Sequence, residues 1–107
     1  MKTGDARQDP ARAQALIENE LAGWRGRGGF DGATMRDFEA HRQVPERVEV
    51  TFSGGLVQVC WAVTRPNGPY QVIYMPRAGY FSLCVASAFG PLDIGVHGAA
   101  IECFGSV

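Results

Sequence analysis

The sequence predicts an α+β fold, in which two N-terminal helices pack on one face of a five-stranded, mostly antiparallel β-meander that can also curve into a roll. Two patterns support this prediction. Apolar residues recur at helical spacing before about residue 42 and alternate with a period of two from residue 48 onward. In addition, 16 of the charged residues precede residue 48, and only five follow it. The charges therefore belong to the helices, and the sheet has little polar surface.

The chain has 107 residues, which is the length of one domain. Within this single domain we expect a flexible tail over residues 1–8, because this stretch is polar and has no apolar periodicity. The helical part is expected over residues 9–45. The antiparallel sheet is expected to occupy residues 46–107.

The first helix is expected to begin at Asp9, whose side chain can cap it, with a proline at the first helical position. Its apolar stripe consists of Ala13, Leu16, Ile17, Leu21 and Trp24. The glycine-rich residues 26–32 predict a loop. A second helix is predicted over residues 34–42, because Thr34 can cap it and Pro45 would end it.

Five strands are predicted from the alternating pattern and from the turn residues that separate them. Their ranges are residues 48–52, 56–65, 70–75, 80–89 and 99–104. Asn67 and Gly68 predict a type I′ hairpin turn, because both residue types tolerate a left-handed backbone. Residues 90–98 are expected to be irregular, with at most a short extended piece near Ile94.

The two faces of the predicted sheet differ in side-chain size. In the second strand the large residues are Val57, Val59, Trp61 and Val63, and the small ones are Gln58, Cys60, Ala62 and Thr64. Neither face carries the charges expected of a surface in water. Two helices cover about one face of five strands. The other face would be covered by a second copy of the chain, by a sheet curled into a roll with an internal pocket, or by a different protein.

Aromatic residues on three consecutive strands predict a binding site. The candidate ligand-binding residues are Trp61, Tyr70, Tyr74, Arg77 and His97. Aromatic rings with a cation beside a concave sheet suit a small apolar or acidic ligand. The alternative is that these aromatic side chains fill the core or an oligomer interface.

Two carboxylate–histidine pairs are candidates for acid–base chemistry. Asp37 lies one helical turn before His41, and Asp93 lies near His97 in the glycine-rich segment. Both pairs are also compatible with an ordinary structural role. We do not expect Cys84 to act as a nucleophile with the second pair, because its strand is apolar and reactive thiols need exposure.

Composition argues against several classes of partner. The net charge is −1, so we expect neither nucleic acid nor an anionic membrane as a partner. No apolar run is long enough to span a bilayer and the first residues do not form a signal peptide, so we expect a cytoplasmic protein. The three cysteines are expected to be buried and reduced, with no metal site and no cofactor. Nine of the ten basic residues are arginine, which is typical of a GC-rich bacterial genome.

These observations favour a small bacterial binding or interaction module that forms a homodimer through a sheet face. A small-ligand pocket between the helices and the sheet is a further expectation. One alternative is a small enzyme with its acid–base site at Asp93 and His97 or at Asp37 and His41. The other is an adaptor that binds a different protein.

Overall fold

The computed structural model describes residues 8–24 and 29–107. Its elements are α1 (Gln8–Trp24), α2 (Gly29–His41), β1 (Arg42–Thr51), the 3-10 turn η1 (Ser53–Gly55), β2 (Val57–Thr64), β3 (Tyr70–Met75), β4 (Tyr80–Ser87), β5 (Gly90–Gly98) and α3 (Ala100–Gly105). The tail predicted over residues 1–8 and the first part of the predicted loop, residues 26–28, fall almost entirely outside the described residues.

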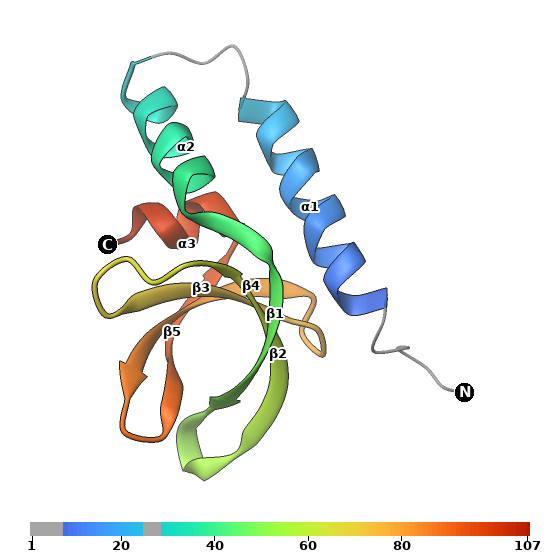
Figure 1. The fold of residues 1–107 in the computed structure, drawn as a ribbon, viewed down its shortest axis with the longest axis vertical. Helices are drawn as coiled ribbons and strands as arrows, with labels where there is room; N and C mark the ends of the chain where they lie inside the picture. The colour runs from blue at the N-terminus through green and yellow to red at the C-terminus, as the bar shows by residue number, and fades with distance from the viewer. Residues whose placement is uncertain (1–7, 25–28) are drawn as a thin grey trace.

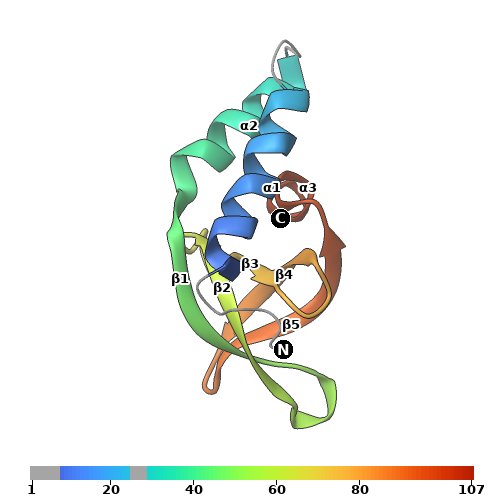
Figure 2. The ribbon, with the colours of Figure 1, turned by 90° about the vertical axis from the view of Figure 1, so that its right-hand side faces the viewer.

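The five strands form one sheet that closes into a barrel in the order β1-β2-β3-β4-β5. Consecutive strands pair antiparallel, and the barrel closes where Thr51 of β1 pairs in parallel with Leu92 of β5. The helices lie together on one side of the ring of strands (Figures 1 and 2). The α+β prediction and the antiparallel pairing are confirmed, but the prediction of an open meander is wrong, because the sheet curls until its ends meet.

A first core, which we call the helix–barrel core, lies between the helices and the outer face of the barrel. Its buried members are Ala13, Ile17, Leu21, Phe38, Val63, Val72, Tyr74, Phe81, Leu83, Ala100, Ile101, Cys103 and Phe104. The predicted apolar stripe of α1 packs here, with Leu16 and Trp24 half-buried at its margin. Helical spacing in the sequence therefore correctly predicted which face of α1 packs against the sheet.

A second core, the barrel interior, lies inside the ring of strands. It consists of Val50, Cys60, Ala62, Ile73, Met75 and Cys84, with Val48 and Phe52 packed against it. Cys60 and Ala62, two members of the predicted small-residue face of β2, therefore point inward. A barrel of only five strands has a narrow bore, and small side chains fill such a space without strain.

The prediction of a last strand over residues 99–104 is wrong, because this segment forms helix α3. The carboxylate of Glu20 on α1 accepts the backbone N–H groups of Ala100 at 2.8 Å and Ile101 at 3.0 Å, which caps the first turn of α3. Ala100, Cys103 and Phe104 are buried at helical spacing. An apolar run of six residues is too short for its periodicity to distinguish a strand from a helix.

Residues 90–98, predicted to be irregular, form strand β5. Its register against β4 shifts between two neighbouring pairs, Leu83 with Val96 and Cys84 with Asp93. The extra residues of β5 form a bulge, in which Gly95 has a φ of 84° that L side chains rarely adopt. Glycine and proline suggested a loop, whereas here they occupy the ends and the bulge of a strand.

The second helix is longer than predicted, and β1 begins earlier than residue 48. Helix α2 starts at Gly29 and ends at His41, and β1 follows at once with Arg42. Pro45 does not end the helix, because the helix has already ended and Pro45 lies within β1. At this point, between Arg42 and Glu46, the pairing of β1 with β2 is irregular. A proline, which cannot donate to the ladder, is tolerated at such a point.

The hairpin between β2 and β3 is not the predicted type I′ turn. Asn67 and Tyr70 exchange both backbone hydrogen bonds, which leaves Gly68 and Pro69 as a two-residue loop. Gly68 has a φ of 62°, and Asn67 has no positive φ. Glycine at the first loop position is the pattern of a type II′ turn, so the tight hairpin was predicted correctly and its register was wrong by one residue.

Candidate functional site

The bulge of β5 directs Asp93 toward a group of hydrogen-bond donors at the rim of the barrel. One oxygen, Oδ1, accepts the hydroxyl of Ser82 at 2.5 Å and the backbone N–H of Gly95 at 3.2 Å. The Nε2 atom of His97 lies 3.1 Å from Oδ2. The Asp93 side chain is only 12% exposed, so this carboxylate is held by the fold.

Electrostatics keep Asp93 ionised. Burial raises the pKa of a carboxyl group, but hydrogen bonds from Ser82, His97 and Gly95 outweigh this effect and lower the pKa of Asp93 below its ordinary value. An ionised carboxylate only accepts hydrogen bonds, so Nε2 of His97 carries the proton. In the neutral ring, Nδ1 is therefore the acceptor nitrogen, and no partner for it is found among the described residues.

The His97 ring also has a fixed orientation. It stacks on the ring of Tyr80, with centroids 4.5 Å apart and an interplanar angle of 18°. The His97 side chain is 33% exposed, and Tyr80 is exposed as well. Asp93 and Tyr80 therefore hold an accessible imidazole in one orientation, an arrangement suited to acid–base chemistry or to accepting a hydrogen bond from a ligand.

No nucleophile accompanies this pair among the side chains that the structure describes around it. Ser82 is fully buried, and its hydroxyl is already donated to Asp93. Cys84 is also buried, and burial together with the negative charge of Asp93 raises the pKa of its thiol to about 12. A thiol in that state does not form the thiolate that nucleophilic attack requires.

The other two cysteines are in the same condition. The pKa of Cys60 is raised to about 11, mainly by burial and to a smaller extent by the charge of Asp93. The pKa of Cys103 is also raised to about 11, mainly by burial and to a smaller extent by the charge of Glu20. All three cysteines are buried, as predicted. They act as small apolar groups in the two cores.

The structure does not bring the five candidate ligand-binding residues into one pocket. Tyr74 is buried in the helix–barrel core, and Trp61 and Tyr70 pack half-buried against it. Arg77 is exposed in the turn between β3 and β4, and His97 lies at the barrel rim. The indole nitrogen of Trp61 is buried without a hydrogen-bond partner among the described residues.

The second carboxylate–histidine pair has the geometry of an ordinary helix end. The Nδ1 atom of His41 lies 2.9 Å from the backbone carbonyl oxygen of Asp37, so the ring interacts with the main chain of the preceding turn. The ring also lies near that of Phe104, with centroids 5.2 Å apart and an interplanar angle of 49°. Of the two pairs, only Asp93 with His97 joins its side chains.

An open cleft of about 450 Å³ lies between α1 and the barrel, beside the stacked rings. It is lined by Leu16, Asn19 and Glu20 of α1, by Gly79, Tyr80 and Phe81 at the start of β4, and by Gly98 and Ala99. Burial raises the pKa of Glu20, against the lowering effect of its two backbone hydrogen bonds. Glu20 was missed at the sequence level, although a charged residue inside an apolar helical stripe was the signal that could have found it.

A second surface feature lies at the end of the barrel where β1 and β2 join. Here Val57 and Phe89 line an open hollow of about 480 Å³, together with Glu49, Thr51 and Gly55. Leu56 and Val59 are also exposed beside Val57. We call Leu56, Val57, Val59 and Phe89 the end patch.

No metal site or membrane span in the described residues, and no relative of the chain, assigns a function. Within residues 8–24 and 29–107, no group of three histidine, cysteine or carboxylate side chains is placed to hold a metal ion. Over the same residues, no helix is both apolar and long enough to cross a bilayer. No protein-family model, curated protein or solved structure matches the chain significantly. Function must therefore be inferred from the geometry.

Proposed function

We propose that the protein is a non-catalytic interaction module that forms a homodimer through the end patch. The observation that carries the proposal is the exposure of Phe89, a residue that is 85% accessible at the tip of the turn between β4 and β5. A phenylalanine in water exposes apolar surface that burial against a partner would remove. Soluble homo-oligomers are most often two-fold dimers, which bring the same patch of both copies together.

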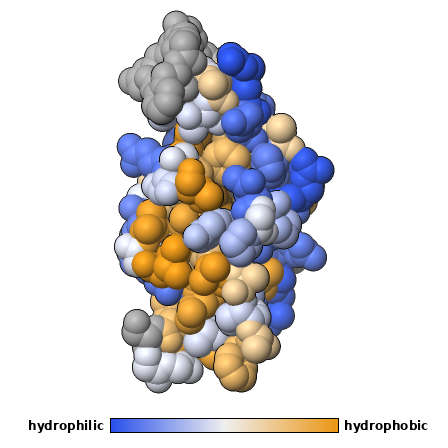
Figure 3. Space-filling view, turned by 90° about the vertical axis from the view of Figure 1, so that its left-hand side faces the viewer, coloured by the Kyte–Doolittle hydropathy of each residue, from blue (hydrophilic) through white to orange (hydrophobic). Residues whose placement is uncertain are grey.

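The neighbours of Phe89 extend this surface. Val57 and Val59 lie on the same outer face of β2 as Trp61 and Val63, but the helices cover only the latter two. Figure 3 views the molecule from the side on which the β4–β5 turn lies in Figure 1, and hydrophobic side chains gather in the middle of that view, above the end that carries this turn. The outer face of the barrel is therefore apolar beyond the area that α1, α2 and α3 protect.

Closure of the barrel changes which face is proposed for the dimer. The sequence favoured the small-residue face, because an open sheet would have left it bare. That face now lines the barrel interior, with Cys60 and Ala62 fully buried. The homodimer is therefore proposed through the large-residue outer face, where polar cover is missing.

Sedimentation velocity at about 50 µM chain, well above a micromolar Kd, tests this proposal. We expect the wild type to sediment as a dimer and Phe89→Ser to sediment as a monomer with an unchanged melting temperature. Val44→Ser is the matched control, since Val44 is 78% exposed but lies seven residues before Thr51 on the same strand. A wild type that stays monomeric would overturn the homodimer and favour an adaptor that offers the end patch to a different protein.

The cleft beside Tyr80 and His97 supports a second candidate function. In this reading His97, oriented by Asp93, binds a small ligand or acts as a general base for an enzyme. The favouring observation is that the free Nδ1 atom sits on an exposed, stacked ring. Hydrolase and isomerase substrate panels test the enzyme, and His97→Gln must abolish any activity found while the melting temperature stays unchanged. Activity that survives this substitution would exclude the site.

A further inference from the structure

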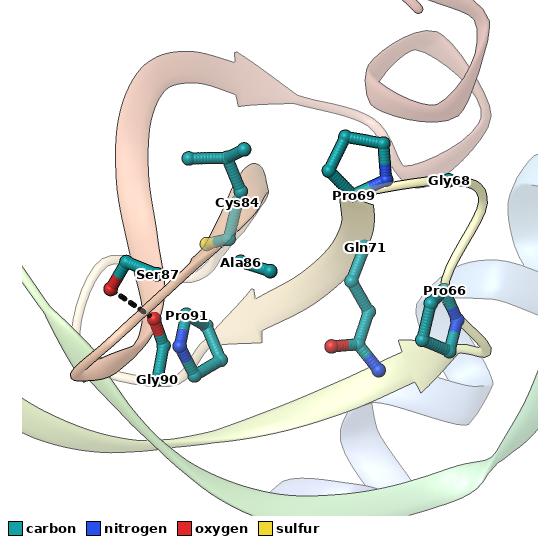
Figure 4. A pocket seen from close by; sticks show the side chains of 10 residues that line it. Pro66, Gly68, Pro69, Gln71, Cys84, Ala86, Ser87, Gly90 and Pro91 are labelled. Atoms are coloured by element: carbon teal, nitrogen blue, oxygen red, sulfur yellow. Dashed lines mark hydrogen bonds between the residues drawn. The ribbon is translucent and has the colours of Figure 1, made fainter.

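A pocket of about 230 Å³ opens between the β2–β3 hairpin and the β4–β5 turn. Its wall includes Pro66, Pro69, Gln71, Cys84, Ala86 and Pro91 (Figure 4). It is separate from the cleft beside α1 and from the end patch, since none of its lining residues belongs to either. The inference below goes beyond the proposed homodimer and does not depend on it.

Prolines and hydrogen bonds restrain the walls of this pocket. Three prolines contribute to them, and each proline ring fixes its own backbone φ. The backbone N–H of Ala86 donates to the carbonyl oxygen of Pro69 at 2.8 Å, which ties the hairpin to β4. The Ser87 hydroxyl donates to the carbonyl oxygen of Gly90 at 2.6 Å, which closes the other side. A preformed cavity loses little entropy when a ligand enters.

One polar group in the pocket has unused hydrogen-bonding capacity. The Gln71 side chain donates from Nε2 to the carbonyl oxygen of Thr64 at 2.9 Å, and this bond fixes the orientation of the amide. Figure 4 shows the Gln71 oxygen turned to the side of Pro91, away from Pro66. No hydrogen bond to this oxygen is found among the residues described. It is therefore a free acceptor.

The rest of the lining excludes charged ligands. No acidic or basic side chain lines the pocket. The thiol of Cys84, one of the lining residues, stays protonated, because its pKa is raised to about 12, chiefly by burial. A charged molecule would lose its hydration here without gaining an opposite charge.

We propose that this pocket binds a small, neutral, mainly apolar ring compound that donates one hydrogen bond to the Gln71 side-chain oxygen. The volume lies below the roughly 300–1,000 Å³ of pockets for drug-sized ligands, so one ring or two fused rings is the appropriate size. Apolar contact with Ala86 and the prolines supplies most of the binding, and the single acceptor supplies orientation.

Indole is a suitable probe, because it is neutral, has two fused rings and donates from one N–H. We expect indole to bind with a Kd of about 1 mM. NMR titration should show saturable shifts of the Gln71 side-chain amide signals and of the Ala86 and Ser87 backbone signals. Its matched partner 1-methylindole has the same rings but no donor. Its Kd should be about five-fold or more higher, which is the loss expected when one hydrogen bond is missing.

Two alanine substitutions separate the pocket from its surroundings. Ala86→Leu fills the pocket and should abolish the indole shifts, while Ala88→Leu, at an exposed turn residue outside the pocket, should leave them unchanged. Phe89→Ser, which disrupts the proposed dimer, should also leave indole binding intact. Failure of the homodimer and failure of the pocket are therefore distinguishable.

Three results would overturn the inference. The first is the absence of saturable shifts with indole at about 5 mM, several times the expected Kd. The second is equal affinity for indole and 1-methylindole, which would exclude the hydrogen bond to Gln71. The third is indole binding that persists in Ala86→Leu or shifts the Tyr80 and His97 signals, which would place the ligand elsewhere.

Discussion

The two cores of this molecule are built from different side chains. The helix–barrel core is filled by large residues such as Phe38, Tyr74, Phe81 and Phe104. The barrel interior has two cysteines and an alanine between Val50, Ile73 and Met75. The same strands supply both cores, since alternate residues of β2, β3 and β4 point to opposite sides.

This difference shows that the size of the side chains on each face of the sheet matches the space available on that side. Helices packed on a sheet leave an interface that large residues fill, whereas the narrow bore of a five-stranded barrel accepts small ones. The helix–barrel core should therefore be most sensitive to loss of volume. The barrel interior should be most sensitive to added volume.

Deleting a large side chain from the helix–barrel core should have the greatest effect. Phe38 is fully buried and packs edge-on against Phe104, with ring centroids 5.8 Å apart. We expect Phe38→Ala to lower the free energy of unfolding by about 4 kcal/mol, measured by urea denaturation. Phe89→Ala, at an exposed site, is the control and should change the stability of the monomer by less than about 0.5 kcal/mol. Equal losses would contradict the assignment of the two phenylalanines.

Enlarging a residue in the barrel interior comes next. Ala62 is fully buried in the barrel interior, on strand β2, which pairs with β1 and β3. The extra carbons of Ala62→Leu must therefore displace neighbouring side chains. The expected loss is about 2–3 kcal/mol in the same denaturation experiment. Ala88→Leu, which adds the same atoms in water, should be nearly neutral. A stabilised Ala62→Leu variant would mean that the barrel interior has unfilled space. It would contradict the conclusion that this core is the one more sensitive to added volume.

The link between α1 and α3 should be the third most sensitive feature. Glu20→Ala leaves the N–H groups of Ala100 and Ile101 without their acceptor, and we expect a loss of about 2 kcal/mol. Glu18→Ala is the matched control, because Glu18 pairs with Arg42 at 3.0 Å on the surface and should contribute less than about 0.5 kcal/mol. If the two variants are equally stable, the cap on α3 does not contribute to folding.

A pH-dependent effect is expected at the barrel rim. The pKa of Asp93 is lowered from its ordinary value of 3.8, so the folded state favours the ionised form. Its stabilising effect is present above that value and is lost as pH falls through the lowered pKa. Asp93→Asn should cost about 1 kcal/mol at pH 7, and the difference from wild type should shrink below about pH 4. Denaturation curves at several pH values would measure it, and a difference that grows on acidification would contradict the sign.

The smallest effect is expected for the conservative substitution Trp61→Phe. Its buried indole N–H lacks a partner among the described residues, which costs free energy that a phenylalanine would not incur. Trp61→Phe loses some packing at the same time, so the net change should stay within about 1 kcal/mol. Trp61→Ala, which only loses packing, should cost about 3 kcal/mol. A large loss in Trp61→Phe would reveal that the N–H is hydrogen-bonded in solution.

Local pattern identified much of the fold in advance. The apolar stripe of α1, the alternation in β1 to β4 and the separation of large from small faces were visible because each depends on residues close in sequence. Prediction from local pattern failed at the last segment, where Glu20 of α1 caps α3 from a distant part of the chain. It also failed at β5, where Gly95 lies in a bulge. The pairing of Asp93 with His97 was found from spacing. The cleft and the pocket at Gln71 were not, since their walls come from distant strands and turns.

By itself, the sequence determined that two helices precede an antiparallel sheet, which residues of each strand share a face, and that charge is concentrated in the N-terminal part. The tertiary structure alone decided that the sheet closes. Closure depends on one pairing between Thr51 and Leu92, which are 41 positions apart, and on the twist accumulated over all five strands. Neither leaves a periodic pattern in the chain. That closure turned the small-residue face from an expected interface into the interior of a barrel.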